Sequence, residues 1–314
     1  MNKKTIISFL ISVLFVVAIL LFVDLKEILG KVFSFGLIAF VIANILFSIL
    51  FIARGIKWKL IVGEYKKVSL RDSTLILIIG FFFNNFFPAR LGEIVRAFVL
   101  SKKIALSKSL SLSTVIVDRL TDLMVLLLLF FFSLFYTDAV PSEISRIALI
   151  LLLFTTALLI LFFLNKRIFF ILSAIFFWLP GKGKKLGKQL LATTQQLKKR
   201  QGIKVWFLSF IVWLLHLPLY YYILSVLGVQ LGAIELLVVM CITSLSSLIP
   251  SAPGYIGTFE ASAILALQIF GVGINTATSF AIIAHLVGYV STTILGFLAL
   301  QELSIKFSEI KKEV

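Results

Sequence analysis

Three ionisable side chains at regular spacing interrupt an apolar part of the chain. Arg90, Glu93 and Arg96 lie in the stretch FNNFFPARLGEIVRAFV, and residues three apart on a helix share one broad face. Arginine suits phosphate, because its planar guanidinium donates two parallel hydrogen bonds and stays charged. One possible function of this stretch is therefore to bind a phosphate headgroup.

A second group of charges offers these arginines partners of another kind. In VDRLTDLMVLLLL, residues 117–129, Asp118 and Asp122 are four residues apart, and Arg119 is three from Asp122. Ionisable groups at membrane depth are costly and usually face a cavity or one another. Together the two stretches contain three arginines and three carboxylates, which leaves two hypotheses open. Either these residues form a neutral ion-pair network, or at least one arginine stays free to bind an anion.

The stretch SSLIPSAPGYIGTFE, residues 246–260, is a second polar break. Gly254 and Gly257 beside two prolines predict a tight turn with exposed amides, and Glu260 begins the segment that follows. Glu260 is expected to carry a proton, to pair with an arginine, or to balance the dipole of a helix start. Four polar residues beside the two breaks are candidates for the cavity lining: Asn84, Asn85, Ser246 and Ser247. We expect them chiefly to form hydrogen bonds with the backbone groups that the breaks leave without helical partners.

Metal and cofactor chemistry finds little support in the sequence. The lone cysteine, Cys241, allows no disulfide framework or thiolate metal site. His216 and His285 lie in different apolar runs, where they could relay protons or, more simply, form hydrogen bonds between helices. No metal and no cofactor is expected.

The composition predicts a membrane protein that consists of helices. Of 314 residues, 61% are hydrophobic and 14% are charged, whereas soluble domains are about 45–50% apolar. The apolar runs are solid, and they do not alternate as the strands of an outer-membrane barrel do. The fold class is therefore an all-α polytopic membrane protein. Its net charge of +16 reflects orientation and anionic lipid, and no nucleic-acid partner is expected.

Six apolar runs are long enough to cross a hydrocarbon core, which takes about 20 helical residues. They are residues 6–23, 33–52, 113–136, 146–164, 205–227 and 277–300. Two further apolar regions, 73–101 and 235–270, contain polar residues, glycine and proline near their middle. We expect each of these to form a re-entrant broken hairpin.

The distribution of Lys and Arg sets the predicted orientation, because basic loops stay on the cytoplasmic side. With both termini inside and 73–101 re-entrant, most of the 30 Lys and Arg residues are cytoplasmic, including those of a loop at 53–72. The strongly basic segment 165–204 is then a cytoplasmic interfacial segment of a single transmembrane domain. It separates two halves, about 1–164 and 205–314, each with one broken hairpin. This arrangement is typical of an inverted-repeat transporter with its site at the midplane.

Three ordered motifs carry a family resemblance: NNFFPARLGEIVR, VDRLTDLMVLLLL and SLIPSAPGYIGTFEA. They resemble the lysylphosphatidylglycerol synthase transmembrane region family, the membrane half of the multiple peptide resistance factor. The resemblance implies a flippase-like domain in the cytoplasmic membrane that moves or binds a lipid with a polar headgroup. In the large lysyl-transferring members a soluble acyltransferase domain follows, whereas this chain ends soon after its last apolar run, so lipid aminoacylation is not expected.

Three functions follow from these observations. The first is a flippase that moves an anionic phospholipid or a polyprenyl-phosphate-linked lipid by alternating exposure of a midplane site. Its movement would run downhill or be coupled to protons, with Glu93, Asp118 or Glu260 as candidate carriers. The alternatives are a membrane-bound transferase acting on a lipid headgroup, and a non-catalytic lipid-binding partner of a separate synthase or glycosyltransferase.

Overall fold

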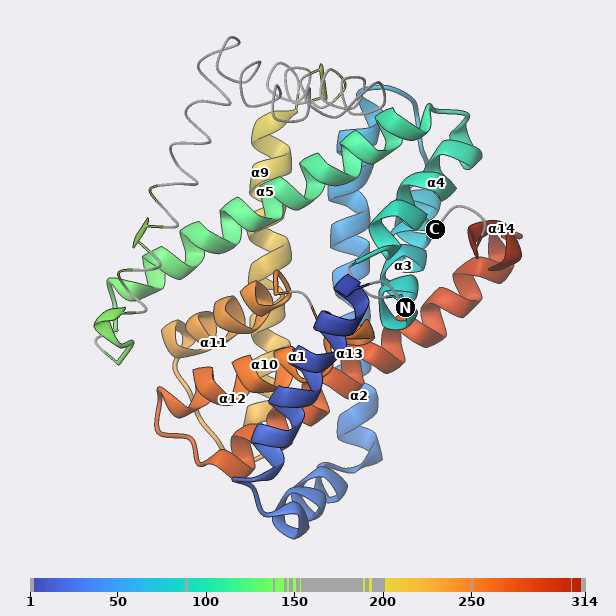
Figure 1. Cartoon of the computed structure of the whole chain (residues 1–314). Helices are drawn as coiled ribbons and strands as arrows, with labels where there is room; N and C mark the ends of the chain where they lie inside the picture. The colour runs from blue at the N-terminus through green and yellow to red at the C-terminus, as the bar shows by residue number, and fades with distance from the viewer. Residues whose placement is uncertain are drawn as a thin grey trace.

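The regular elements of the protein are helical throughout the described residues (Figure 1). The computed structural model describes residues 3–87, 90–137, 139–143, 146, 149–150, 153, 189, 192–193, 201–249, 251–305 and 307–311. The all-α fold class is thus confirmed for this part of the chain. Most of the expected span at 146–164, nearly all of the basic segment 165–204 and the two prolines Pro88 and Pro250 lie outside the described residues.

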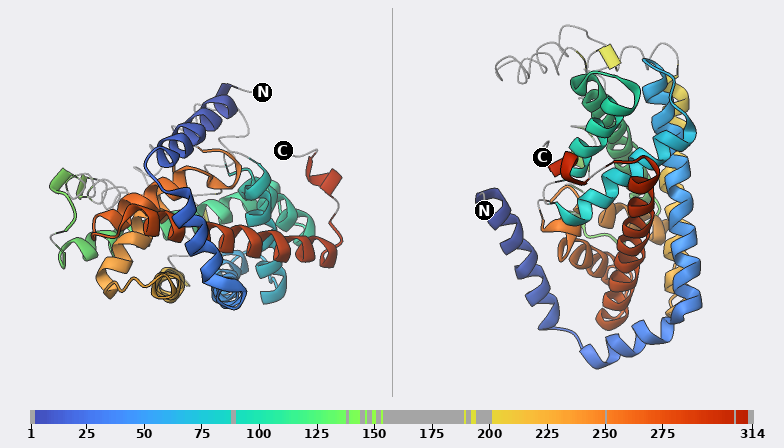
Figure 2. Two further views of the ribbon diagram at one scale, coloured as in Figure 1. Left: turned by 90° about the horizontal axis from the view of Figure 1, so that it is seen from below. Right: turned by 90° about the vertical axis from the view of Figure 1, so that its right-hand side faces the viewer.

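The second helix is much longer than the apolar run that predicts it. After α1 (Lys3–Leu20), α2 extends over Leu25–Gly63, and Figure 2 shows its main part running along the length of the molecule. The Asp24 side chain caps its start by accepting hydrogen bonds from two backbone amides, and Gly36, with φ of 75°, introduces a bend. The assignment of residues 53–63 to a loop is therefore wrong.

The first interrupted region folds as a helical hairpin. Helices α3 (Leu70–Phe86) and α4 (Gly92–Ile104) pack against each other on either side of the break. Glycine makes this close packing possible, because a Cβ atom on Gly92 would overlap the carbonyl oxygen of Gly80. Two apposed helices, and not one continuous span, thus form region 73–101.

Two expected spans are each continuous helical segments. Helix α5 (Lys108–Leu134) is capped by Ser107, whose side chain accepts a hydrogen bond from the amide of Leu110, and it covers all but the last two residues of the run at 113–136. Helices α9 (Gly202–Leu214) and α10 (His216–Val226) follow one another directly and cover the run at 205–227.

The second interrupted region is also a hairpin. It consists of α11 (Ala233–Ser246), the short 3₁₀ helix η1 (Pro253–Tyr255) and α12 (Thr258–Gln268), with α11 and α12 packed together. A glutamate in the first turn of each long helix accepts a hydrogen bond from the backbone amide at its N-cap. This capping arrangement explains why both helices restart after glycine.

Helix α13 (Ile274–Glu302) connects the two hairpins and is followed by α14 (Phe307–Lys311). The open end of the first hairpin lies at the C-terminal end of α13, where Arg71 pairs with Glu302. The open end of the second hairpin lies at its N-terminal end, since α12 leads into α13 through a short turn. The two breaks meet near the middle of α13, and the hairpins therefore approach this point from opposite ends of one helix.

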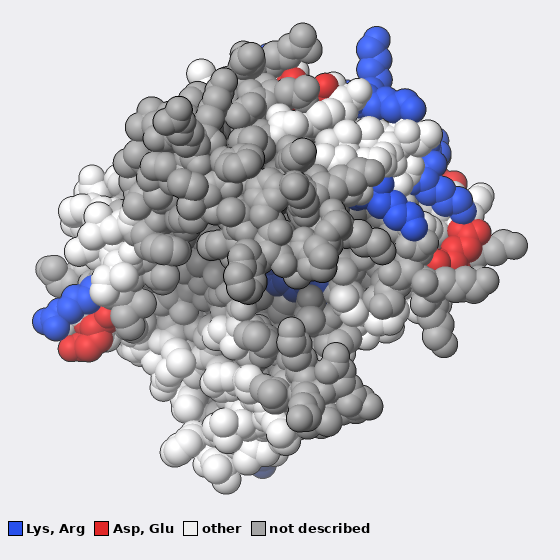
Figure 3. Space-filling view, turned by 45° about the horizontal axis from the view of Figure 1, so that its top comes forward, with Lys and Arg blue, Asp and Glu red and all other residues white. Residues whose placement is uncertain are grey.

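The exposed surface carries many large apolar side chains. Three helical segments are long and apolar enough to cross a membrane: Leu25–Gly63, Gly202–Val226 and Ile274–Glu302. Side chains on α2 such as Phe33, Leu37 and Ile38 are more than three-quarters exposed, which is expected of a surface in contact with lipid. On the face drawn in Figure 3, most of the described charged side chains lie toward the margins of the molecule.

Candidate functional site: a charged network and a cavity between two helix breaks

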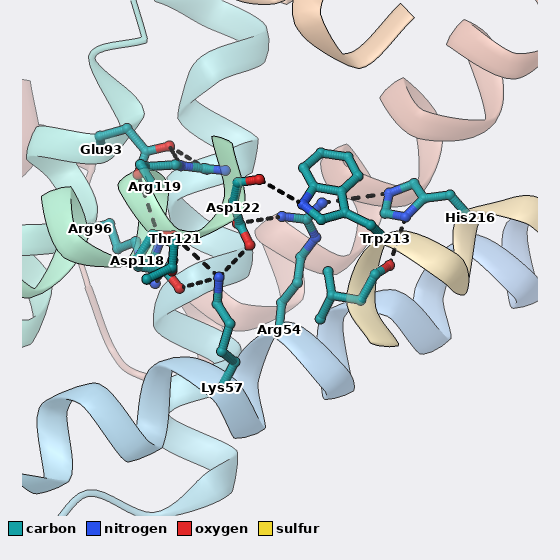
Figure 4. Close-up of polar contacts among 11 residues, drawn as sticks. Arg54, Lys57, Glu93, Arg96, Asp118, Arg119, Thr121, Asp122, Trp213 and His216 are labelled. Carbon is teal, nitrogen blue, oxygen red and sulfur yellow. Dashed lines mark hydrogen bonds and ion pairs between the residues drawn. The ribbon is translucent and has the colours of Figure 1, made fainter. Parts of the chain in front are cut away.

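Two aspartates of α5 form the centre of a buried ion-pair network (Figure 4). Lys57 Nζ lies 2.8 Å from Asp118 Oδ1 and also pairs with Asp122. Arg54 Nη1 lies 3.5 Å from Asp122 Oδ2. The Lys57 side chain is 1% exposed, so its interaction with the aspartates is a buried one, and loss of either partner would be costly.

The arginines of α4 and α5 complete the network. Arg96 Nη2 lies 2.9 Å from Asp118 Oδ2, and the Arg96 guanidinium lies over the Trp58 ring, 3.7 Å from its centroid. Arg119 pairs with Glu93 from the preceding helix. The structure therefore brings together five of the predicted site residues, all as ion-pair partners: Glu93, Arg96, Asp118, Arg119 and Asp122.

The sequence analysis missed two cations of this network. Arg54 and Lys57 were assigned to a cytoplasmic loop, yet both are buried on α2. The sequence did contain a signal for them. Arg54 and Lys57 are three residues apart, which places them on one helix face, and no proline interrupts the chain before the end of α2. Two residues of α9 and α10 also contact this network. Trp213 donates a hydrogen bond from Nε1 to the carbonyl of Asp122, and Nε2 of His216 lies 3.5 Å from the Arg54 guanidinium.

The network has more cations than carboxylates. The described members are four cations, Arg54, Lys57, Arg96 and Arg119, and three carboxylates, Glu93, Asp118 and Asp122. This composition differs from a neutral network of three arginines and three carboxylates, which was one of the two hypotheses from the sequence. Arg90 does not belong to it by contact, because its hydrogen bonds are made elsewhere.

Arg90 lines a cavity between the two breaks. The cavity has a volume of about 210 Å³ and is lined on one side by Asn84 and Arg90 and on the other by Ser247, Gly254 and Tyr255. Arg90 donates hydrogen bonds to the carbonyl and to the hydroxyl of Ser247, the latter at 2.5 Å. Its guanidinium lies 5.8 Å from the centroid of the Tyr255 ring. Within the described residues, Arg90 has no carboxylate within ion-pair distance.

The two asparagines hold the first break in different ways. Asn84 Oδ1 accepts a hydrogen bond of 2.9 Å from the backbone amide of Gly92, so Asn84 provides a partner for a backbone group at the break, as expected. Asn85 instead donates to α13, at 2.7 Å to Thr292 Oγ1 and 3.0 Å to Thr293 Oγ1. The first break is thereby fixed both to its own hairpin and to the middle of α13.

The second break depends on backbone conformations that glycine adopts readily. Gly254 and Gly257 have φ values of 71° and 87°, in the left-handed region. Glu260 accepts a hydrogen bond of 2.7 Å from the amide of Gly257, which agrees with its predicted role at a helix start. Its other partner is His285 of α13, and no arginine of the described chain pairs with it. Among the described residues, no three His, Cys, Asp or Glu side chains gather as a metal site requires.

These features define a class of protein. Long apolar helices with lipid-facing surfaces enclose two broken hairpins, and the polar groups of the hairpins lie inside, at a cavity and at a buried charged network. Such an arrangement is that of a helical integral membrane protein with an internal polar site.

The chain belongs to the lysylphosphatidylglycerol synthase TM region family, whose model matches residues 5–296. It is 27% identical to a UPF0104 membrane protein of Methanocaldococcus jannaschii, over 95% of this chain and 94% of that protein. It is 23% identical to a UPF0104 membrane protein of Methanothermobacter thermautotrophicus, over 94% of this chain and 92% of that protein. The resemblance inferred from the three motifs is thus confirmed, and the protein is an integral membrane protein of this family.

Proposed function

We propose that the protein is a flippase-like transporter of the cytoplasmic membrane that binds a phosphate-bearing lipid headgroup in the cavity between the two hairpin breaks. The observation that carries this proposal is Arg90, an arginine at the cavity whose hydrogen bonds go to neutral groups of Ser247. The substrate class is an anionic phospholipid or a polyprenyl-phosphate-linked lipid, which share the phosphate that arginine recognises.

The local charge supports an anionic ligand. The network next to the cavity already has one more cation than carboxylates, and Arg90 adds another positive charge. Excess positive charge at membrane depth is unfavourable unless an anion compensates it. A phosphate beside Arg90 would supply this compensation, with the Ser247 hydroxyl at the same cavity as a further hydrogen-bond partner.

The backbone of Arg90 supports a specialised role for this residue. Its φ of 57° is left-handed, a conformation that costs a residue other than glycine about 1–3 kcal/mol and that clusters at ligand sites. Glycine would fit this conformation better, so the presence of arginine indicates that the guanidinium itself is needed at the break.

The hairpins suggest how a headgroup would cross the membrane. We propose that 73–101 is re-entrant from the cytoplasmic side and 235–270 from the outside, as parts of two inverted halves. Their open ends, which lie at opposite ends of α13, support this proposal, and the distribution of Lys and Arg in the sequence gives the orientation. Movement of one hairpin relative to the other would expose the Arg90 cavity first to one side and then to the other, while the acyl or isoprenoid chains stay in lipid.

The experiment is a lipid translocation assay in proteoliposomes that contain the purified protein. Fluorescent phosphatidylglycerol and a fluorescent polyprenyl phosphate are tested separately, with wild type, Arg90→Lys, Arg90→Gln and Arg71→Gln. Arg71→Gln is the matched control, because this arginine is exposed and lies at the open end of the first hairpin, at the opposite end of α3 from the cavity. We expect Arg90→Gln to lose translocation at least about tenfold, Arg90→Lys to retain part of it since lysine is a point charge, and Arg71→Gln to match wild type.

The same assay distinguishes the alternatives. Equal rates for wild type and Arg90→Gln would reject the proposed headgroup site. A wild-type protein that moves neither lipid, but releases a chemically modified headgroup detected by mass spectrometry, would indicate the transferase instead.

A further inference from the structure

Glu260 and His285 form a hydrogen-bonded pair directly behind the second break. Nδ1 of the His285 imidazole bonds to Oε1 of Glu260. The other ring nitrogen, Nε2, lies 2.6 Å from the carbonyl oxygen of Gly254. The second carboxylate oxygen of Glu260 accepts a hydrogen bond from the amide of Gly257. Both ring nitrogens of the imidazole therefore face oxygen atoms.

Hydrogen-bond chemistry requires this pair to hold an additional proton. A carbonyl oxygen can only accept a hydrogen bond, so Nε2 must carry hydrogen. Nδ1 then either donates its own hydrogen to the Glu260 carboxylate or accepts the hydrogen of a Glu260 carboxylic acid. Both arrangements contain one proton more than a neutral imidazole beside an ionised carboxylate. Both also give the pair a net charge of zero, the state that membrane depth favours.

We propose that Glu260 and His285 form a proton-binding site whose occupancy controls the turn at Gly254 and Tyr255 and so couples protons to headgroup binding at Arg90. Loss of the proton places a lone pair of the imidazole against either the Glu260 carboxylate or the Gly254 carbonyl, and one of the two hydrogen bonds is lost. The coupling rests on the proposed transport function, whereas the proton site is independent of it.

The turn connects the pair to the cavity through a short path. Gly254 and Tyr255 both line the cavity, and Tyr255 lies under the Arg90 guanidinium. Their φ values of 71° and 63° are both left-handed, which is strained for tyrosine. Release of the Gly254 carbonyl by His285 therefore acts on a strained segment that directly contacts the headgroup-binding arginine.

The surroundings of the pair allow proton exchange and contain no competing charge in the described chain. The side chains of His285 and Glu260 are 16% and 17% exposed. The Phe259 ring lies 5.2 Å from the imidazole. The Tyr289 ring of α13 lies against Gly254. Other titratable residues of the neighbouring elements have partners of their own: Tyr255 with Arg90, Tyr220 with Thr243, Cys241 with the Leu126 carbonyl, Lys31 with Thr276 and Glu27, and Glu235 with the Gly232 amide.

The other two candidate proton carriers have different partners. Glu93 pairs with Arg119, and Asp118 is held by Lys57 and Arg96. Lysine and arginine keep their charge, so these carboxylates have permanent cationic partners. A histidine partner is different, because it can give up its proton in the physiological pH range. Among the three candidates named from the sequence, Glu260 is therefore the one placed to release a proton.

Nuclear magnetic resonance of ¹⁵N-labelled histidine tests the proton site directly. The chain has 2 histidines, and the variant His216→Gln leaves His285 as the source of the signal. We expect the ring nitrogen signals of His285 to change between about pH 5 and 9 as the proton is lost. In Glu260→Gln the side-chain nitrogen can donate to Nδ1 of a neutral imidazole, while the side-chain oxygen still accepts from the amide of Gly257. The imidazole then needs no additional proton, so we expect a His285 signal that does not respond to pH.

Glu235→Gln is the matched control, since Glu235 caps the start of α11 as Glu260 caps α12 but has no histidine partner. It should leave the pH response of His285 unchanged. A His285 signal that is constant over this pH range in the parent protein would overturn the proton site. An equal pH response in Glu260→Gln would overturn the role of Glu260.

Translocation in proteoliposomes with an imposed pH gradient tests the coupling. We expect wild type and Glu235→Gln to change their rate with the gradient, and Glu260→Gln to lose this dependence. A Glu260→Gln protein that responds to the gradient like wild type would overturn the coupling. If the wild type moves no lipid at all, the transport function and the coupling fail together, and the histidine spectra still decide whether the pair binds a proton.

Discussion

Asp118 is held by two buried cations, Lys57 and Arg96, and the stability of the network depends on it. We predict that Asp118→Asn destabilises the protein by about 3–5 kcal/mol, because Arg96 is left buried beside a neutral amide. Thermal unfolding of the purified protein in detergent measures the change. Glu302→Gln, which removes the partner of the exposed Arg71, should cost less than about 1 kcal/mol.

The double variant Asp118→Asn, Arg96→Gln gives a further check. In Asp118→Asn, Arg96 keeps only its longer ion pair of 3.7 Å with Glu93. Removal of this arginine should therefore recover part of the lost stability, so that the two changes together cost less than their sum. Strict additivity would contradict a direct interaction between these two side chains.

Arg90 is predicted to show the opposite behaviour, with a large effect on lipid and a small one on folding. Arg90→Gly removes the guanidinium and relieves the left-handed backbone at φ of 57°, but it also gives the unfolded chain more freedom. We expect a stability change below about 1 kcal/mol together with loss of binding to vesicles that contain polyprenyl phosphate. A strongly destabilised Arg90→Gly protein would indicate that this arginine serves the fold.

For individual residues, the sequence offered pairing among the charged residues of α4 and α5 as one of its two hypotheses, because ionisable residues in apolar runs usually face a cavity or one another. It did not predict that Arg54 and Lys57 join them. Their partners, Asp118 and Asp122, lie more than sixty residues away in the chain. Local patterns carry no information on such contacts, so two cations at the end of an apolar run are interpreted as a loop.

The close contact of α3 and α4 depends on Gly92. We predict that Gly92→Ala costs about 1–3 kcal/mol and weakens lipid transport, because the new methyl group overlaps Gly80 and Asn84 and pushes the hairpin apart. Thermal unfolding and the proteoliposome assay measure the two effects.

Gly30→Ala is the control for this prediction. Gly30 lies within α2 with no atom near the position of an added Cβ. Alanine favours helix over glycine by about 1 kcal/mol, so this variant should be neutral or slightly more stable. Similar losses in both variants would contradict the packing explanation.

The interrupted hairpins are the elements that the sequence predicted best. Proline and glycine mark both breaks, with two asparagines at the first and two serines at the second, and each break separates two helices in the structure. The boundary of α2 was predicted least well. Its apolar run ends near residue 52, but the helix continues to Gly63, and its last turns are buried by the ion pairs of Arg54 and Lys57 together with core packing of Trp58, Ile61 and Val62.

For the whole molecule, the two hairpins should open to opposite sides of the membrane. We predict that a cysteine at Lys67, before the first hairpin, reacts with an impermeant maleimide from the cytoplasmic side, and that one at Gln230, before the second, reacts from the outside. Both positions are exposed, and the native Cys241 is buried and should not react. Labelling of intact cells and of inverted vesicles measures the two sides. Reaction of both cysteines from one side would exclude the inverted arrangement.

Helix α13 has a consequence for how the molecule can move. His285 holds the second break and Thr292 holds the first, and these residues are seven positions apart, which is about two turns and therefore one face of the helix. A rotation of α13 about its own axis would carry both attachments in the same direction. Both breaks are therefore attached to one face of one helix, and a rotation of α13 would displace them together.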